Sequence, residues 1–257
     1  MSAKTYYEQI NNVLASIHNR EGEKIERAGE MLAESIAAGG RAYLFGSGHS
    51  VIPVMDIFPR YGSFVGFFPL YDPRLMWHNV VGPGGARELL WLERREGYIQ
   101  NFLQSYAFAP VDCMIVFSHG GLNAAPIEAA RYAKDKGLKV ITVSSFANAA
   151  STKATHSSGK KLSDLADIAI DNCVPPEDAL VDIGNPEKIG AGSTMAAVFI
   201  AMTLVTETGS RLKAKGIKPQ TFVSPNVPGT SKDHNLRVFD SYTGKLFERS
   251  PVEYAEV

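Results

Sequence analysis

Two short turns rich in glycine and hydroxyl groups carry the residues of this sequence best suited to chemistry. The first, GSGHS, spans residues 46–50 and follows the apolar run RAYLF; the second, SHGGLN, spans residues 118–123 and follows CMIVF. Each precedes a helix-like segment, so each reads as a strand-to-helix turn. Such a turn presents free backbone N–H groups, hydroxyl donors and the positive end of a helix dipole, which together suit a phosphate group.

The spacing of the glycines narrows the kind of phosphate that these turns would hold. Neither turn has the pattern G-x-x-x-x-G-K-[ST] of a nucleoside triphosphate site. The first turn also lacks the third glycine of a dinucleotide fingerprint, because Val51 stands in its place. The spacing therefore disfavours both a nucleoside triphosphate and a dinucleotide, and the alternative is that each turn only connects a strand to a helix. The candidate phosphate-binding residues in the turns are Ser47, Ser50, Ser118, Gly121 and Asn123. Asn123 is also expected to cap the helix that follows it.

Candidate acid and base groups lie in or near these turns. Glu93, in LERREGY, is our first candidate for a general base, and Glu128 is the alternative; either could instead be a solvent-facing charge on a helix. His49 lies within the first turn and is either a proton donor or a group that stabilises the turn. A base of this kind can remove an acidic C–H proton beside a carbonyl group. Returning the proton at the former carbonyl carbon gives an isomerase, whereas expelling an oxygen from the next carbon gives a dehydratase or an etherase.

The elements that must position these residues alternate between strand and helix. Strand-like apolar runs occupy 41–45, 113–117, 138–145 and 166–170, and they lack the alternation of a half-exposed sheet. We therefore predict an α/β fold with a doubly wound parallel sheet in three layers. Because ligands bind beyond the carboxyl ends of parallel strands, both glycine turns are expected at one edge, where they form one pocket.

Helices are predicted on both sides of this sheet. Residues 10–36 have helical spacing and form two amphipathic helices or one long kinked helix, and 124–136 forms another. A strongly apolar helix covers about 195–205. It begins near Ser193 and Thr194, which are either its N-cap residues or ligand contacts.

The chain is predicted to form one domain over 1–257, because no internal repeat or linker divides it. We expect a helical extension over about 1–40, a core over about 41–216 and a C-terminal tail over about 217–257. Within the core, 71–97 is predicted to be a long functional loop ending in a helix. In the tail, the polar residues from Ser224 onward are expected to cover the rim of the site.

Composition excludes several classes of protein. The 257 residues carry 26 basic and 27 acidic side chains, a formal net charge of −1, so no global field attracts nucleic acid or an anionic membrane. The longest apolar run is too short to span a bilayer, and the first residues do not read as a secretory leader. Cys113 and Cys173 lack C-x-x-C spacing, so we expect no structural disulfide and a cytoplasmic protein. The six histidines are scattered, and we predict no metal and no cofactor.

The two turns resemble the signature of the sugar isomerase (SIS) domain family of phosphosugar-binding proteins. FGSGHS is similar to its first motif, G-x-G-x-S, and SHGGLN to its second, S-x-S-G-x-T. In the second motif Gly120 replaces a serine and Asn123 replaces a threonine, which leaves Ser118, the Asn123 amide and backbone N–H groups for the phosphate. Ser144 and Ser145, at the end of the strand KVITV, resemble family positions near the phosphate or the sugar hydroxyls.

Three longer segments are similar to one group within that family. They are HSSGKKLSDLAD (156–167), AGST (191–194) and SPNVPG (224–229). The group includes an N-acetylglucosamine 6-phosphate dehydratase. The resemblance therefore implies a lyase that dehydrates an amino-sugar 6-phosphate such as N-acetylglucosamine 6-phosphate, with Glu93 as the proton acceptor and His49 or His234 as the donor.

The resemblance also implies an oligomer and leaves alternatives open. SIS enzymes act as dimers or tetramers, and a C-terminal or neighbouring-subunit histidine can enter their site, which is why His234 is a candidate donor; a homodimer or homotetramer is therefore expected. One alternative is an isomerase similar to phosphoheptose isomerase. The other is a non-catalytic phosphosugar sensor, although no helix-turn-helix segment accompanies the domain and the charge is balanced.

Overall fold

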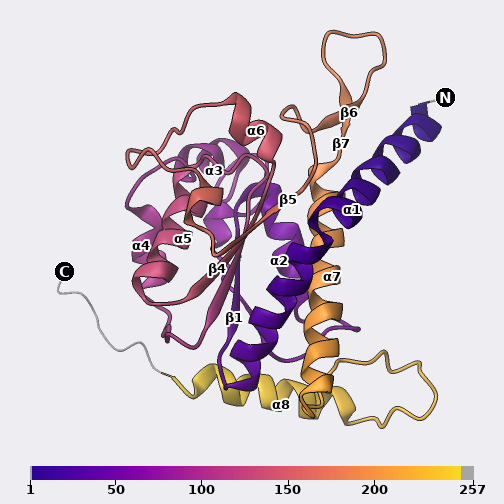
Figure 1. Ribbon diagram of the computed structural model, residues 1–257. Coiled ribbons are helices and arrows are strands. Elements are labelled where there is room, and N and C mark those ends of the chain that lie inside the picture. Colours follow the sequence, from indigo (N-terminus) through magenta and orange to yellow (C-terminus); the bar gives the residue numbers. More distant parts are fainter. Residues whose placement is uncertain (1, 250–257) are drawn as a thin grey trace.

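The computed structural model describes residues 2–249, and these form three layers around a parallel sheet (Figure 1). The five strands have the order β2-β1-β3-β4-β5, and every neighbouring pair is parallel. They are β1 (Ala42–Gly46), β2 (Phe67–Pro69), β3 (Cys113–Phe117), β4 (Lys139–Ser144) and β5 (Ile168–Asp171). The predicted α/β fold with a doubly wound parallel sheet is confirmed.

One face of the sheet is covered by α1 (Ser2–Ala37), α2 (Val51–Ile57) and α7 (Ser193–Ala214) (Figure 1). The region predicted as two helices or one long helix is the single continuous helix α1. Its apolar residues recur at helical spacing and are buried between the sheet and α7. The strongly apolar helix predicted over about 195–205 is the N-terminal half of α7, which packs along α1 and α2.

The opposite face carries α3 (Ala86–Leu92), α4 (Tyr98–Leu103) and α5 (Ala124–Asp135). Between β2 and α3 the chain is irregular apart from the 3-10 turn η2 (Pro73–Leu75), so the expected long loop ending in a helix is confirmed. Three further short helices lie beside the carboxyl ends of strands or lead into β5. They are η1 (Gly48–Ser50), α6 (Phe146–Ser151) and η3 (Leu162–Leu165).

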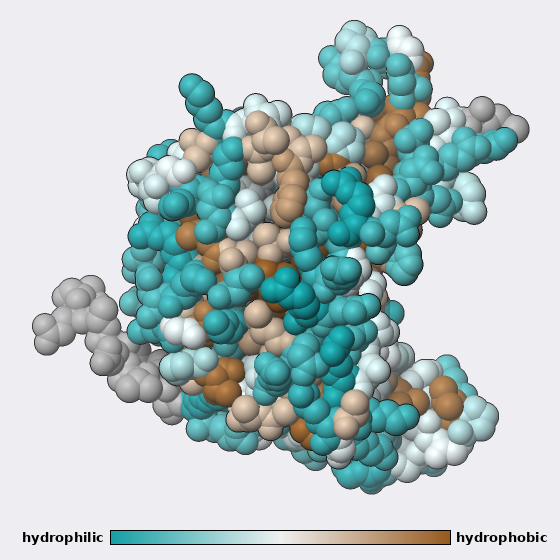
Figure 2. Space-filling model, viewed as in Figure 1, coloured by the Kyte–Doolittle hydropathy of each residue, from teal (hydrophilic) through white to brown (hydrophobic). Residues whose placement is uncertain are grey.

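A two-stranded antiparallel hairpin, β6 (Ala179–Val181) and β7 (Ile189–Ala191), was missed by the sequence analysis. It projects from the body next to the N-terminal end of α1, where the Tyr6 hydroxyl donates to the Ala191 carbonyl over 2.8 Å (Figure 1). Apolar surface gathers on this hairpin in Figure 2, and both Ile183 and Ile189 are exposed. Its strands have three residues each, too few for a period-two pattern to stand out.

The last helix, α8 (His234–Phe247), lies at the amino-terminal edge of the sheet (Figure 1). Arg41, just before β1, donates to the Lys245 carbonyl, and Arg249 donates to Asp112, just before β3. The expectation that the residues from Ser224 onward cover the rim of the site is therefore wrong for the described part of the tail. Aromatic side chains of this mainly polar helix hold it at the amino-terminal edge, because Tyr242 packs on Phe58 and Phe68 and Phe239 packs on Phe222. Residues 250–257 of the expected tail lie outside the described range. No helix within residues 2–249 is long and apolar enough to cross a membrane.

Candidate functional site

The two glycine turns leave the same edge of the sheet. β1 and β3 are adjacent parallel strands, and Gly46 pairs with Phe117 at their carboxyl ends. The prediction that both turns share one edge is confirmed. The first turn is so tight that a Cβ on Gly46 would lie 2.1 Å from the backbone oxygen of Ser50, which explains the glycine at that position.

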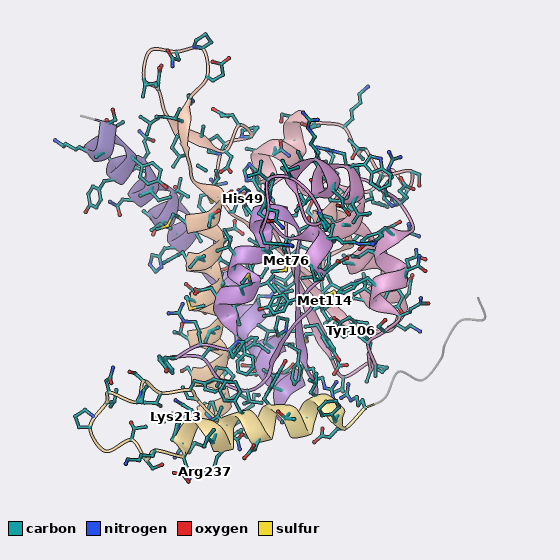
Figure 3. All side chains as sticks on the ribbon, turned by 180° about the vertical axis from the view of Figure 1, so that it is seen from behind. His49, Met76, Tyr106, Met114, Lys213 and Arg237 are labelled. Atoms are coloured by element: carbon teal, nitrogen blue, oxygen red, sulfur yellow. The ribbon has the colours of Figure 1, made fainter. Side chains whose placement is uncertain are left out.

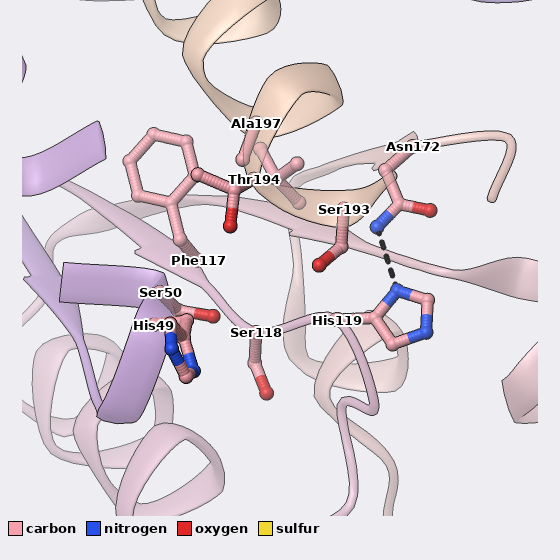
Figure 4. A pocket seen from close by; sticks show the side chains of 10 residues that line it. His49, Ser50, Phe117, Ser118, His119, Asn172, Ser193, Thr194 and Ala197 are labelled. Atoms are coloured by element: carbon pink, nitrogen blue, oxygen red, sulfur yellow. Dashed lines mark hydrogen bonds between the residues drawn. The ribbon is translucent and has the colours of Figure 1, made fainter. Parts of the chain in front are cut away.

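A small pocket opens between these turns and the first turn of α7 (Figure 4). The hydroxyl groups of Ser50, Ser193 and Thr194 face a common space in this view. The lining residues with polar side chains are His49, Ser50, Ser118, His119, Asn172, Ser193 and Thr194. Within the described residues, the lining includes no lysine or arginine. An anion in this pocket would therefore be held by neutral donors and backbone N–H groups.

The start of α7 is capped by a residue that sequence reasoning did not single out. Asp178 accepts from the backbone N–H groups of Gly192 and Ser193, over 3.1 and 2.7 Å, and from the Ser193 hydroxyl over 2.7 Å. The N-cap position itself is Gly192, so neither Ser193 nor Thr194 is the N-cap residue. Both hydroxyls face the pocket in Figure 4, and the Ser193 hydroxyl also donates to Asp178.

Glu93 lies directly against the first turn. It follows α3, only 6 % of its surface is exposed, and its Oε2 accepts a 2.9 Å hydrogen bond from the Ser47 hydroxyl. Burial raises the pKa of the Glu93 carboxyl above its ordinary value, while the hydrogen bond from Ser47 and the charge of Arg94 act in the opposite direction. A buried carboxylate with a raised pKa, held against a glycine-rich turn at the edge of the sheet, has the properties of a general base.

His49 projects from the first turn and packs on Trp77, with 5.1 Å between the ring centroids. Trp77 belongs to the irregular segment before α3. Its indole nitrogen would lie 3.0 Å from a Cβ placed on Gly48, where φ is +59°. Glycine at this position therefore allows both the left-handed backbone and the close approach of the indole. The long loop covers the outer side of the first turn.

In the second turn, several candidate groups bond to the turn itself. The Gly121 N–H donates to the Ser118 hydroxyl over 3.2 Å, and the Gly121 carbonyl accepts from Leu162. Asn123 stands at the N-cap position of α5, as expected, but its side chain makes no capping hydrogen bond. The capping role assigned to the Asn123 side chain is therefore wrong, although the helix begins where the sequence predicts.

Ser144 and Ser145, at the end of β4, are both buried. Ser144 lies against the second turn, since a Cβ on Gly121 would be 3.3 Å from the Ser144 Cβ. The Ser145 hydroxyl donates to the Val174 carbonyl over 2.6 Å and accepts from the Asn148 N–H over 3.1 Å, which caps α6. Ser145 thus joins three segments at the carboxyl edge.

His234 lies far from the other candidates within one chain. It is the first residue of α8, and its Nε2 is 2.8 Å from the Thr221 carbonyl. Figure 3 shows His49 in the upper half of the view and α8, with Arg237 labelled, at the bottom. The structure brings Glu93 and His49 to the same turn, and His234 would reach them only from another copy of the chain.

Two pocket residues, His119 and Asn172, were missed by sequence reasoning. The Asn172 Oδ1 accepts from the Val174 N–H over 3.0 Å, so its amide nitrogen faces the His119 Nδ1 at 3.1 Å (Figure 4). The His119 Nδ1 is therefore the acceptor, and the Nε2 proton points to the Pro176 carbonyl at 3.4 Å. Their positions in the sequence could have indicated both residues, because His119 lies within the second glycine turn and Asn172 directly follows β5.

Comparisons with known proteins find relatives of this chain by sequence and by fold. The family model described as SIS domain matches residues 5–145. A UPF0309 protein of Halalkalibacterium halodurans is 32% identical over 238 residues, covering 92% of this chain and 96% of the relative. The structure of a phosphoheptose isomerase from Francisella tularensis aligns with a TM-score of 0.54 at 14% identity, covering 81% of this chain and 96% of that one. The structure of a phosphoheptose isomerase from Neisseria gonorrhoeae aligns with a TM-score of 0.53 at 14% identity, covering 81% and 97%. At these identities the structural likeness concerns the fold.

Proposed function

The chain belongs to the SIS domain family, and from this premise we propose that it is a phosphosugar-binding lyase that dehydrates an amino-sugar 6-phosphate such as N-acetylglucosamine 6-phosphate. The observation that carries the proposal is the hydrogen bond between Ser47 and Glu93. It joins a buried carboxylate to the first turn of a hydroxyl-lined pocket. The phosphoheptose isomerases with the same fold support a phosphorylated sugar as the ligand class.

We propose that the pocket between the two turns receives the phosphate group. Hydroxyl donors from Ser50, Ser118 and Thr194 line it. We propose that the sugar chain of a phosphate held there extends toward His49, which lines the pocket, and toward the neighbouring Ser47–Glu93 pair. Holding the reacting carbon close to a fixed base supplies a large part of the acceleration in such reactions.

The proposed reaction begins on the open-chain aldehyde. The Glu93 carboxylate takes the proton from C2, and the electrons of the broken C–H bond form an enolate with the C1 carbonyl. The enolate then forms the C1 carbonyl again, its carbon–carbon electrons make a C2–C3 double bond, and the C3–O bond breaks with its electron pair on oxygen. His49 gives its proton to the departing oxygen, which leaves as water. The raised pKa of Glu93 makes it a stronger base than an exposed carboxylate, which suits the first step.

An isomerase would share the first step and differ in the second, because it returns the proton to C1 and expels nothing. The two reactions are separated by incubating the purified protein with N-acetylglucosamine 6-phosphate in D₂O and following the products by mass spectrometry. Dehydration removes the mass of one water molecule. Isomerisation keeps the composition and introduces deuterium at carbon. Binding without either change identifies a sensor and contradicts the proposal.

A matched pair of variants links the activity to the site. Glu93→Gln removes the base and is expected to abolish measurable turnover. Glu88→Gln removes an exposed carboxylate from the same helix and is expected to leave turnover unchanged. Equal losses in the two variants would show that the assay does not report on Glu93.

A further inference from the structure

Three titratable side chains, Glu96, Glu128 and His156, form a cluster at the Gly97 end of the segment 93–97, which begins with Glu93. Two of them are buried: Glu128 and His156 are 4 % and 5 % exposed. The His156 Nε2 lies 3.6 Å from the Glu128 Oε1 and 3.8 Å from the Glu96 Oε2. Within the described part of the chain, neither the His156 Nε2 nor the Glu128 Oε2 has a hydrogen-bond partner. Buried polar atoms are rarely left without a hydrogen-bond partner in native proteins, so this cluster needs a functional explanation.

The hydrogen bonds of His156 place its ring proton. The Ser158 N–H donates to the Nδ1 over 3.1 Å, so Nδ1 is an acceptor and the neutral ring carries its hydrogen on Nε2. That N–H faces both carboxylates at distances just beyond a hydrogen bond. His156 is therefore placed to act as a donor shared between Glu96 and Glu128.

Both carboxylates hold the segment from Glu93 to Gly97. The Glu128 Oε1 accepts from the Gly97 N–H over 2.7 Å. Glu96 accepts from the Ser157 N–H over 2.7 Å and also from the Ser157 hydroxyl. One end of the segment is thereby tied to α5 and to the loop that contains His156.

The Glu93 end of this segment is tied to the same helix. The Glu93 carbonyl accepts from the Ala125 N–H in the first turn of α5 over 3.0 Å. Glu128 lies one turn further along α5, so that helix holds the segment at both ends. A displacement at Glu96 or Gly97 is transmitted over three or four residues to the Glu93 carboxylate.

We propose that Glu96, Glu128 and His156 form a positioning cluster that sets where Glu93 stands relative to the substrate. The inference rests on the proposed function of Glu93 and extends it to residues that do not touch the substrate. Without this donor, both carboxylates lose the N–H that lies within 4 Å of each, and we expect the repulsion between their charges to displace the segment. A misplacement of about 1 Å at a reacting group costs on the order of 100-fold in rate.

Two substitutions of His156 test this proposal by their kinetics. His156→Leu removes the donor, and we expect kcat to fall by about tenfold to 100-fold while KM changes little, because the cluster does not line the phosphate pocket. His156→Gln places an amide N–H near the Nε2 position and is expected to restore most of kcat. If kcat falls equally in both variants, or if KM rises as much as kcat falls, the proposal is overturned.

Asp167→Asn supplies a control for general destabilisation. Asp167 lies at the amino-terminal edge, where it accepts from the Val140 N–H and pairs with Lys134. At equal loss of thermal stability, this variant is expected to keep its kcat. If it loses as much kcat as His156→Leu, the cluster has only a structural role and the proposal is wrong.

Hydrogen exchange in the ligand-free protein separates this inference from the proposed function. The Gly97 and Ala125 amides donate to Glu128 and to the Glu93 carbonyl, so they report on the segment directly. Exchange at both is expected to be faster in His156→Leu than in the wild type or in His156→Gln. If exchange at the Gly97 and Ala125 amides is unchanged in His156→Leu, the proposed positioning role of the cluster is overturned even if the enzyme is active. A wild-type protein that turns over no sugar phosphate overturns the proposed function, while the exchange still decides whether the cluster fixes the segment.

Discussion

Replacing Glu93 by glutamine is expected to abolish activity and to change how stability depends on pH. The substitution keeps the size of the side chain and an oxygen that can accept from Ser47, but it removes the negative charge. A positioned general base contributes about 100-fold to 10,000-fold to a rate, so a loss within this range is expected for kcat. KM should change little, because the hydroxyl-lined pocket remains.

The effect on stability follows from the direction of the pKa shift. Burial raises the pKa of the Glu93 carboxyl in the folded protein above its value in the unfolded chain. Between these two values the folded state binds more protons than the unfolded state, so the free energy of unfolding falls as pH rises through that window. Above this pH window, ionised and buried Glu93 therefore lowers the free energy of unfolding of the wild type. Below about pH 4, near the ordinary pKa of a glutamate, the carboxyl is protonated in both states and this destabilisation is absent.

The measurement is the midpoint of thermal unfolding for the wild type and Glu93→Gln from about pH 4 to about pH 8. The stability of the variant relative to the wild type is expected to increase as pH rises, because glutamine has no charge to bury. A difference that stays constant with pH would refute the argument that Glu93 is ionised at a cost in the folded protein. Glu88→Gln serves as the control, since Glu88 is exposed and should give parallel curves.

Three further predictions concern the remaining groups of the site. Ser47→Ala removes a hydrogen bond that lowers the pKa of Glu93, so the acid limb of the kcat/KM profile should move to higher pH; an unmoved limb would separate Ser47 from the base. Thr194→Val removes a hydroxyl donor from the pocket and should weaken binding of the sugar phosphate by about tenfold to 100-fold, measured by thermal shift, since hydrogen bonds to charged groups contribute about 1.5–3 kcal/mol. His234→Ala should retain turnover if His49 is the proton donor, whereas a loss without unfolding would assign the donor to His234 of another copy.

The sequence predicts the part of the fold whose signals are local. Four apolar runs predict β1, β3, β4 and β5 and their parallel direction, and the glycine turns after the first two runs predict the edge where the pocket forms. The short edge strand β2 was missed. The hairpin β6–β7 and helix α8 give weaker local signals. The hairpin strands are short, and α8 is a mainly polar helix whose aromatic residues find partners from distant segments.

The candidate site is predictable as a set of residues but not as a set of contacts. Glu93, Ser47 and His49 each stand out by type and position. The hydrogen bond from Ser47 to Glu93 depends on how the long loop before α3 folds back over 46 residues, and no local pattern encodes that path. His156 illustrates the same limit, since its partners lie on α5 and beside α4, far from it in the sequence.

The lack of lysine and arginine in the pocket lining, within the described residues, determines how its affinity for phosphate responds to salt. The lining residues within 2–249 include neither lysine nor arginine, and the carboxylate of Asp178 already occupies the start of α7. A phosphate dianion would therefore be bound by short, directional dipoles and not by mobile counter-charges on the surface. Ionic strength screens separated charges beyond roughly 10 Å at 0.1 M, but it acts weakly on contacts at hydrogen-bond distance. Sugar phosphate binding by this protein should persist in concentrated salt, where a lysine-lined site would release the same ligand.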